Sequence, residues 1–222
     1  MDGIDYFEIE KALWCNVSVG AKKGENFGAI MGPDVVRNEE GKVVINGETG
    51  LPEFDSTLHT LGNSSWDWTG GFYHTFTFGD FRLSAAFDVK WGADVFSMSM
   101  RSAYETGRAL ETLAGREEWY ASEEARLAAG KTLAAWRAAR NAKGLVVDGV
   151  ILQPDGSYKP NDIPVNPESY WKAMASSAPG TFIYDNSYIK CREITFGYNV
   201  PEKLLGKRIK GKIGRASCRE RV

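Results

Sequence analysis

The feature that most constrains this chain is an alternation of apolar and polar side chains along residues 70–91, which is unbroken from Phe81 to Trp91. From Phe81 to Trp91 every second residue is apolar, and mostly polar residues stand between them. Residues 72–78 repeat this pattern, with His74 as the exception on the apolar side. A period of two residues is typical of a strand with one apolar and one wet face. The two-residue connection Gly79-Asp80 predicts an antiparallel hairpin with a type I′ or II′ turn.

The length of each arm agrees with two architectures. Each arm has about the 9–11 residues that a tilted transmembrane strand needs. Aromatic residues stand at the ends of the apolar runs, with Phe78 and Phe81 beside the turn and Trp91 at the far end, as in the girdles of membrane barrels. A hairpin of a soluble β-sandwich alternates in the same way. The hairpin alone therefore leaves both architectures open.

Composition adds few restrictions. The chain has 222 residues, of which 43% are hydrophobic, enough for the core of one or two domains. A net charge of -2 gives no reason to expect nucleic acid as a partner. Seven Trp, nine Tyr and 24 Gly fit a β protein that is rich in aromatic residues and turns. The first ten residues lack the basic and apolar regions of a signal peptide.

The residues that usually carry chemistry are scattered. Cys15, Cys191 and Cys218 form no CxxC motif, and His59 and His74 have no partner at ligand spacing, so we expect neither a metal site nor a cofactor. The acidic residues show no pairing that would favour catalysis. We therefore expect no catalytic residues and no enzymatic activity.

The remaining segments predict further short elements. Residues 13–22 alternate loosely as a strand, residues 27–36 and 42–46 are β-prone runs around a turn, and residues 47–65 have the composition of a loop. The stretches 95–113 and 117–142 are rich in Ala, Glu and Arg and predict helices, the second with Ser122 as its N-cap.

Towards the C-terminus, three more elements are expected. Asp155-Gly156 predicts a small hairpin, and Pro167 opens a short helix. Residues 188–200 again alternate, with Ile194, Phe196 and Tyr198 on one face. The connection before this strand, residues 92–186, is far longer than is common inside a compact domain, and it indicates a functional loop.

The last ten residues, 213–222, have a different origin in our interpretation. Their sequence Ile-Gly-Arg-Ala-Ser-Cys-Arg-Glu-Arg-Val is what a widely used sequencing-adapter oligonucleotide would encode. We expect this segment to be read-through and residues 1–212 to be the protein.

Three stretches together resemble the C-terminal part of the SusC/RagA-type TonB-linked outer-membrane proteins. The family's Asn-Pro-Asp-Trp-Thr-Gly-Gly-Phe and Thr-Phe-Thr-Tyr-Lys-x-Phe-x-Leu-Ser correspond to residues 63–72 and 75–84. Its Gly-Gly-Asp-Val corresponds to residues 92–95, and its Tyr-x-x-Leu-Arg-Glu-Ile run ending in Pro corresponds to residues 188–201. The chain departs from these motifs at Ser64-Ser65, at Phe78-Gly79 and at Cys191.

The resemblance implies an all-β fold with helical loop insertions, an antiparallel sheet that is part of a transmembrane β-barrel. The family imports oligosaccharides or peptides across the outer membrane of Bacteroidota, with a SusD-like surface lipoprotein outside and TonB supplying energy from inside. Its barrel belongs to the large plugged class. On this basis residues 92–186 are an extracellular loop, and residues 1–212 are an open part of the barrel without its plug.

Two sets of site residues follow from this interpretation. The side chains that would face outer-membrane lipid are Phe81, Leu83, Phe87, Val89, Trp91, Ile194, Phe196 and Tyr198. Trp66 and Trp68 would lie at the extracellular rim and are candidates for contact with a ligand, because aromatic faces stack on sugars. The alternative function is a soluble, aromatic-rich β module that binds glycans, in which the same apolar side chains would point into a closed core.

Overall fold

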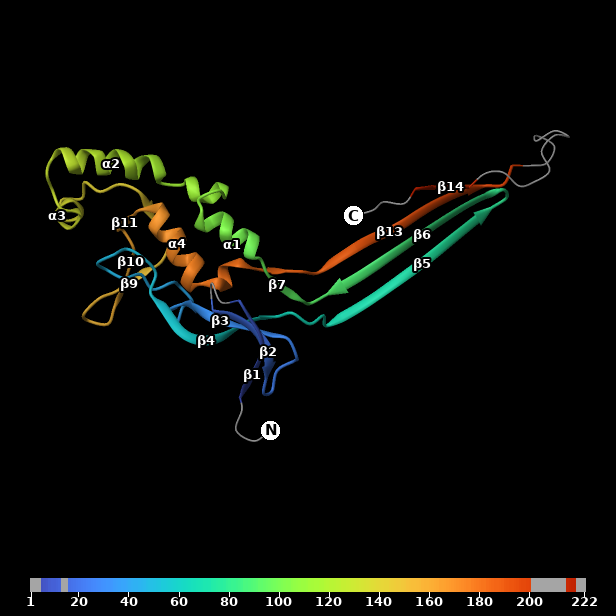
Figure 1. Cartoon of the computed structure of the whole chain (residues 1–222). Helices are drawn as coiled ribbons and strands as arrows, with labels where there is room; N and C mark the ends of the chain where they lie inside the picture. The colour runs from blue at the N-terminus through green and yellow to red at the C-terminus, as the bar shows by residue number, and fades with distance from the viewer. Residues whose placement is uncertain (1–4, 13–15, 201–214, 219–222) are drawn as a thin grey trace. The chain divides into compact units, whose positions relative to one another are not determined.

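The computed structural model describes residues 5–12, 16–200 and 215–218, and for residues 12 and 215–218 only the backbone is described. These residues belong to two compact units (Figure 1). Unit 1 combines the chain up to Ser64 with Val95–Tyr184, and unit 2 combines Ser65–Asp94 with the chain from Asp185. The long connection between the two predicted strands of unit 2 therefore folds together with the N-terminal part of the chain.

Unit 1 begins with a four-stranded antiparallel sheet whose strands follow chain order. They are β1 (Tyr6–Ala12), β2 (Val17–Lys22), β3 (Ala29–Val35) and β4 (Phe54–Asn63). Ile30 of β3 is almost fully buried and packs with Val17 against Phe96 and Ile183 from later in the chain. The sheet thus supplies one part of the core of unit 1.

Strand β4 shows that the prediction of a loop over residues 47–65 was wrong for its second half. This segment pairs with β3 over most of its length, for example Met31 with Thr60 and Val35 with Phe54. Half of its side chains are exposed, the other half are partly buried and none is fully buried, which agrees with a composition that includes Asp, Ser and Thr. Buried backbone groups need hydrogen-bond partners, so the buried β3 requires a neighbouring strand whatever the composition of that strand.

A second cluster of unit 1 gathers short strands around Ile45. These are β8 (Leu145–Val146), β9 (Val150–Leu152), β10 (Tyr158–Pro160) and β11 (Pro164–Val165), in the pairs β10–β9 and β11–β8. Ile45 packs with Val147, Ile151 and Val165. The predicted hairpin at Asp155-Gly156 is confirmed by the pairing of β9 with β10.

The helices of unit 1 are short. They are α1 (Met98–Glu105), η1 (Leu110–Leu113), α2 (Arg116–Ala128), α3 (Leu133–Ala138), α4 (Pro167–Ser177) and η2 (Pro179–Phe182). In addition, β7 (Asp94–Phe96) pairs with β12 (Ile183–Asp185). Helix α4 packs against α1, η1, η2 and β3, and its side chains Met174 and Ala178 join Val35 in a third cluster. Pro167 stands in its first turn as predicted, after the N-cap Asn166.

The prediction of Ser122 as an N-cap was wrong. Helix α2 begins six residues earlier, after Gly115 in a left-handed conformation, where a Cβ atom would lie 2.4 Å from the nitrogen of Leu145. Ser122 is buried in the middle of this helix, and its hydroxyl accepts hydrogen bonds from Trp136 Nε1 and from the backbone nitrogen of Lys143, both at 3.1 Å. The hydroxyl fixes residues 136–143 to α2 instead of starting the helix.

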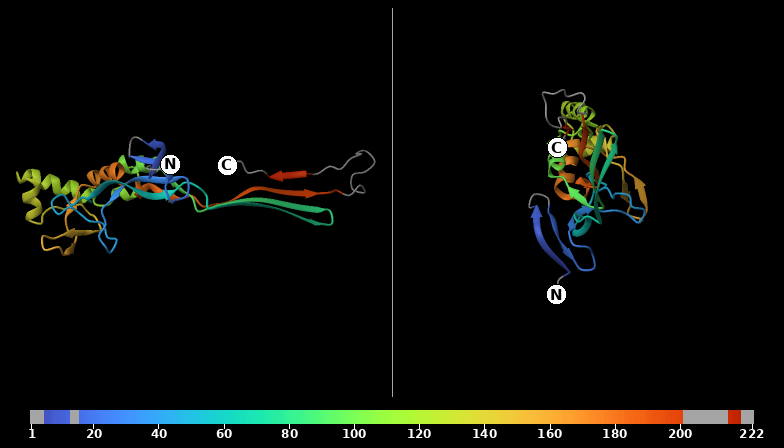
Figure 2. Two further views of the ribbon diagram at one scale, coloured as in Figure 1. Left: turned by 90° about the horizontal axis from the view of Figure 1, so that it is seen from below. Right: turned by 90° about the vertical axis from the view of Figure 1, so that its right-hand side faces the viewer.

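Unit 2 is one antiparallel sheet in the order β14-β13-β6-β5 (Figure 2). Its strands are β5 (Trp68–Phe78), β6 (Phe81–Trp91), β13 (Tyr188–Tyr198) and β14 (Arg215–Cys218). The predicted hairpin is confirmed, with Phe78 opposite Phe81. Gly79 has φ +56°, and the described non-glycine residues with positive φ do not include Asp80, which matches a type II′ turn. Of the expected read-through segment 213–222, only β14 lies within the described residues.

The described part of the chain is therefore mostly antiparallel sheet with few helices, in agreement with the predicted all-β class with helical insertions. Its strands form five separate sheets, and none of these closes into a barrel within the described residues. Among these residues, no helix has the length and apolar character needed to span a bilayer.

Candidate functional site

The candidate site is the side of the β5–β6–β13 sheet that carries the apolar side chains, which we call the apolar face. Directly opposed residues of antiparallel strands lie on the same face. The pairing places Phe72 opposite Phe87 and Phe76 opposite Leu83, and Leu83 is also opposite Phe196 of β13. The two apolar runs found in the sequence therefore meet on one surface.

A β-bulge keeps this surface apolar along the whole of β13. The register shifts between Cys191 and Glu193, so Arg192 has no partner in β6. As a result, Ile189 lies on the same face as Ile194, although their positions differ in parity. The signal was present in the sequence, because apolar residues occupy odd positions before Arg192 and even positions after it, but the prediction from alternation did not include it.

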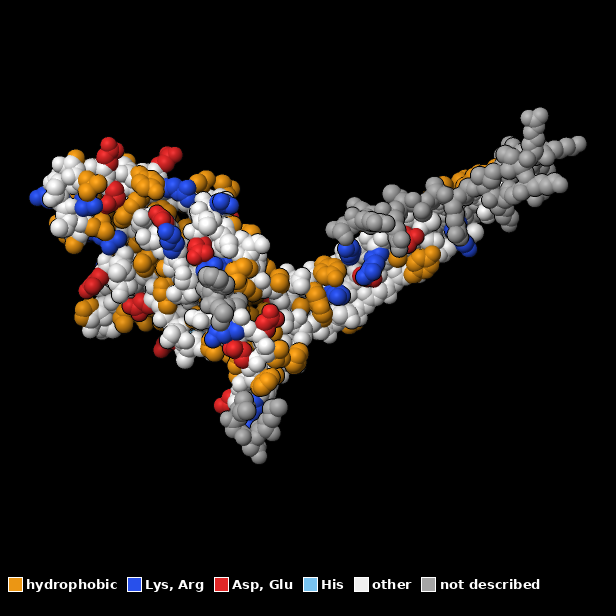
Figure 3. Space-filling model, viewed as in Figure 1, with side chains coloured by type: hydrophobic (Ala, Val, Ile, Leu, Met, Phe, Trp, Pro, Cys, Tyr) orange, Lys and Arg blue, Asp and Glu red, His pale blue; other side chains and the backbone are white. Residues whose placement is uncertain are grey.

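The apolar face is largely exposed. Phe81, Leu83, Trp91, Ile194 and Phe196 keep 44–59% of their surface, and Phe87, Val89 and Tyr198 are half-buried. Hydrophobic side chains are visible along the described strands of unit 2 in the space-filling view (Figure 3). The large side chains of this face that are exposed are Trp68, Phe72, Phe76, Phe78, Phe81, Leu83, Trp91, Ile189, Ile194 and Phe196.

Aromatic rings gather at both ends of the apolar face. Beside the turn, the ring of Phe81 lies 4.6 Å from that of Tyr198 and 5.8 Å from that of Phe196, measured between centroids. At the other end Trp68 is paired with Trp91. From Phe81 to Trp91, a rise of about 3.4 Å per residue gives about 34 Å. At a strand tilt of about 40°, this corresponds to a height of about 26 Å, close to the apolar band of a membrane barrel.

His74 is the polar exception on this face. Its ring lies between Phe72 and Phe76, with centroids 6.1 Å and 5.8 Å away. The face is therefore a continuous row of rings along β5, and the imidazole takes part in it.

The opposite side of the sheet, the polar face, carries charged and hydroxyl groups. Asp88 of β6 forms an ion pair with Arg192 of β13. The hydroxyls of Thr75 and Ser84 are hydrogen-bonded across β5 and β6 at 3.0 Å. The Asp88–Arg192 pair, whose side chains keep 30% and 65% of their surface, suits a face in contact with water, whereas Ser84 itself is buried.

The two tryptophans predicted to contact a ligand lie on different faces. The ring of Trp66 lies edge-on to that of Tyr188, with centroids 5.7 Å apart. Lys90 Nζ lies 5.1 Å from the centroid of the Trp66 ring. Tyr188 and Lys90 belong to the polar face, so Trp66 lies on that side of the sheet. Trp68 belongs to the apolar face, and its ring covers Gly70, where a Cβ atom would lie 2.6 Å from it. The structure therefore does not bring these two side chains together in one site.

Sequence reasoning missed a further feature, a pocket in unit 1. Its walls include Tyr104, Tyr120 and Trp171, which come from three different helices. Their spacing in the sequence carries no signal, since only the packing of α1, α2 and α4 brings them together.

Within the described residues, no three His, Cys, Asp or Glu side chains are grouped in a way that could hold a metal ion. No protein-family model matches the chain, and no curated protein matches its sequence with significant similarity.

Proposed function

We propose that the chain is part of an outer-membrane, TonB-dependent importer of oligosaccharides or peptides of the SusC/RagA type. The observation that carries this proposal is the long, exposed apolar face of β5, β6 and β13 with aromatic rings at both ends. In the proposed function this face contacts outer-membrane lipid, and the polar face lines the interior of the barrel.

Strand length supports a membrane barrel over a sandwich. Each of the three strands has 11 residues. Strands of globular proteins have most often about 5–6 residues, whereas transmembrane strands need about 9–11. Soluble monomers also rarely expose contiguous apolar patches larger than a few hundred Å². Both comparisons favour lipid as the neighbour of the apolar face.

The lengths of the connections between the strands support one orientation of the sheet in the membrane. At one end of the sheet β5 and β6 are joined by two residues, and at the other end β6 and β13 are separated by residues 92–187. Outer-membrane barrels have short periplasmic turns and longer extracellular loops. We therefore assign Gly79-Asp80 to the periplasm and residues 92–186 to the exterior, where a SusD-like lipoprotein would bind. TonB would act through a plug that these residues do not include.

The second candidate is a soluble β module that binds glycans. One observation favours it, namely the aromatic cluster of Trp66 and Tyr188 on the polar face, which a sugar could contact in water. This function requires a cover over the apolar face. In the described residues the exposure of Phe81, Leu83 and Phe196 offers no support for one.

Cysteine labelling in whole cells tests the proposal. In the protein made in the outer membrane, with Cys15 and Cys191 replaced by Ser, single cysteines are placed at Asp80 and at the exposed Lys131. We expect a membrane-impermeant maleimide to label Lys131→Cys in intact cells and Asp80→Cys only after lysis. Labelling of Asp80→Cys in intact cells, with protection of Lys131→Cys, would refute the orientation.

The upstream reading frame gives a second test. An importer of this type requires a signal peptide and a plug domain encoded before the barrel. Sequencing of the genomic region that precedes the chain should find both. An upstream frame that encodes only a soluble domain without an export signal would favour the glycan-binding module.

A further inference from the structure

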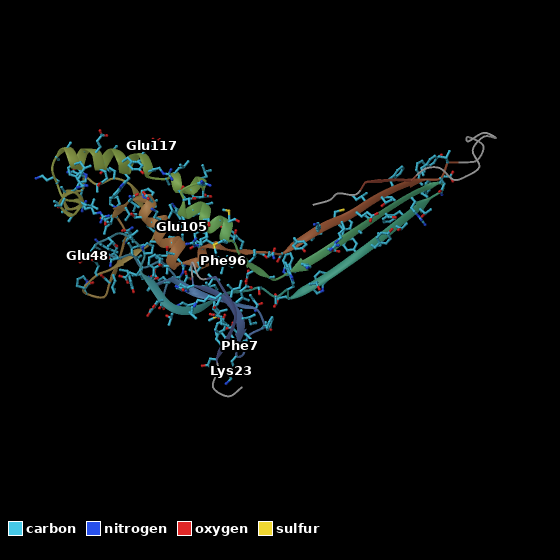
Figure 4. All side chains as sticks on the ribbon, in the orientation of Figure 1. Phe7, Lys23, Glu48, Phe96, Glu105 and Glu117 are labelled. Atoms are coloured by element: carbon cyan, nitrogen blue, oxygen red, sulfur yellow. The ribbon has the colours of Figure 1, made fainter. Side chains whose placement is uncertain are left out.

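The pocket in unit 1 has the size and lining of a binding site. Its volume is about 510 Å³, within the range of about 300–1,000 Å³ that small-molecule sites occupy. It lies among α1, η1, α2 and the N-terminal end of α4, and Glu105, labelled in Figure 4, belongs to its wall. The pocket consists entirely of residues of unit 1.

Aromatic side chains make up part of this wall. The ring of Tyr104 lies 4.6 Å from Trp171 and 5.5 Å from Phe182, and Trp171 lies 4.8 Å from Tyr170. These contacts help to hold the rings of Tyr104 and Trp171 in place. Tyr120 also lines the pocket and is 60% exposed, so much of its ring surface is free.

Charged groups of both signs line the same pocket, and each is held by a partner. Glu105 accepts two hydrogen bonds from Arg101, at 2.9 and 3.4 Å. Lys172 Nζ lies 2.6 Å from Glu168 Oε1. Arg116 Nη2 donates to the carbonyl oxygen of Gly107 at 3.3 Å and to two oxygens of Thr112 at 3.2 and 3.1 Å.

These partners fix donors and acceptors before any ligand arrives. Two carboxylates and two cations line the pocket, so their formal charges cancel. Preorganised groups lose little entropy when a ligand binds, and therefore favour a ligand with several hydrogen-bonding groups.

The lining suits several other ligand classes less well. A fatty acid would remove the charged groups from water without replacing their hydrogen bonds. A strongly anionic ligand would meet the carboxylates of Glu105 and Glu168. An extended peptide that binds by adding a strand needs an open strand edge. Helices provide most of these walls, and the backbone groups in their interior are bonded within each helix.

We propose that this pocket binds one or two rings of a neutral sugar. The C–H face of a pyranose ring carries partial positive charge, which suits the negative face of an aromatic ring such as Tyr120. Its hydroxyls both donate and accept hydrogen bonds, so they can use Lys172, Arg116 and the two carboxylates together.

The sugar pocket is separate from the lipid-facing sheet. It lies in unit 1, and its occupancy does not require that unit 2 spans a membrane. If the import function is correct, the pocket selects sugars over peptides on the extracellular side. If labelling refutes the import function, sugar binding by the pocket remains a separate result.

Saturation-transfer NMR with the full chain in detergent tests the sugar pocket. The probes are maltose, cellobiose, lactose and mannobiose, with trialanine and galacturonate for comparison. We expect at least one disaccharide to give a signal, and the two comparison compounds to give none. Absence of a signal from all four disaccharides, or a signal from trialanine alone, would overturn the proposal.

Variants then locate the binding. Tyr120→Ala removes an exposed ring from the pocket, and we expect it to weaken binding about tenfold, because the aromatic face on which the sugar would stack is lost. The matched control is Tyr158→Ala, which removes a ring that is 46% exposed from β10, outside the pocket. Equal binding by the two variants, with unchanged circular dichroism, would place the sugar elsewhere and overturn the proposal.

Discussion

The alanine pair in the middle of β6 allows the most direct test of the two faces. Ala85 lies on the apolar face between His74 and Ile194, and Ala86 lies on the polar face between Tyr73 and Glu193. The side chains are identical and the positions are adjacent. Replacing each with Arg therefore makes the same chemical change on opposite sides of one strand.

The expected loss of unfolding free energy depends on how deep the residue lies in the bilayer. Ala85 is four residues from Phe81, which places it about 10 Å inside an apolar band of about 25 Å when the strand is tilted by about 40°. An arginine near the bilayer midplane on the lipid side costs about 2–4 kcal/mol. Ala86→Arg should cost little, since its side chain would face the interior and lie opposite the carboxylate of Glu193.

Denaturant unfolding of the intact protein measures both costs, first in lipid vesicles and then in lipid-free buffer. We expect Ala85→Arg to lower the unfolding free energy by about 2–4 kcal/mol in lipid, and we expect no cooperative unfolding transition in lipid-free buffer, because the apolar face then has no lipid to cover it. Equal costs for the two variants in lipid would refute the assignment of the faces. A cost for Ala85→Arg that is as large in buffer would indicate a closed apolar core instead.

Three further predictions concern turn geometry, acid stability and the core of unit 1. Gly79→Ala should destabilise the hairpin by about 1 kcal/mol in the same assay, because a Cβ atom at φ +56° strains the backbone although the space around it is open. Hydrogen bonds from Thr57 and His59 lower the pKa of Asp55 from 3.8 to about 2. The stabilisation from this carboxylate is therefore complete above pH 4 and lost as the pH falls towards 2, so an acid titration of Asp55→Asn should lack this part of the transition. Arg101→Met should cost about 1–3 kcal/mol in thermal unfolding, since it leaves the carbonyl of Ala175, to which Arg101 Nε donates at 2.8 Å, without this donor.

The parts of the fold that could be predicted are those set by local patterns. The hairpin of β5 and β6 follows from alternation and from Gly79-Asp80, and the start of α4 follows from Pro167. Strand β4 could not be predicted from its composition. Its side chains reflect contact with water, whereas its extended conformation depends on pairing with β3. Ser122 is a residue type that often caps helices. In this chain its hydroxyl instead accepts hydrogen bonds from Trp136 and Lys143, which attach residues 136–143 to α2.

The candidate site likewise has parts that the sequence predicts and parts that it does not. The apolar positions of β6 were visible in the sequence, since they depend on a period of two within one strand. The positions of Trp66 and Trp68 on opposite faces depend on where β5 begins, which alternation from Phe72 onwards does not define. The sugar pocket depends on three helices and had no local pattern at all.

The edges of the sheet in unit 2 add a further argument about its surroundings. Within the described residues, β5 pairs only with β6, and β14 covers only Ile194–Gly197 of β13. Open edges of this length invite pairing with other strands.

A second sheet packed on the apolar face, as in a sandwich, would cover the side chains but leave these backbone groups unpaired. Further strands of a closed barrel would pair both edges while lipid covers the face, and unpaired groups in lipid cost several kcal/mol each. The barrel is therefore the arrangement that satisfies both the face and the edges, which supports the proposed membrane function over the soluble alternative.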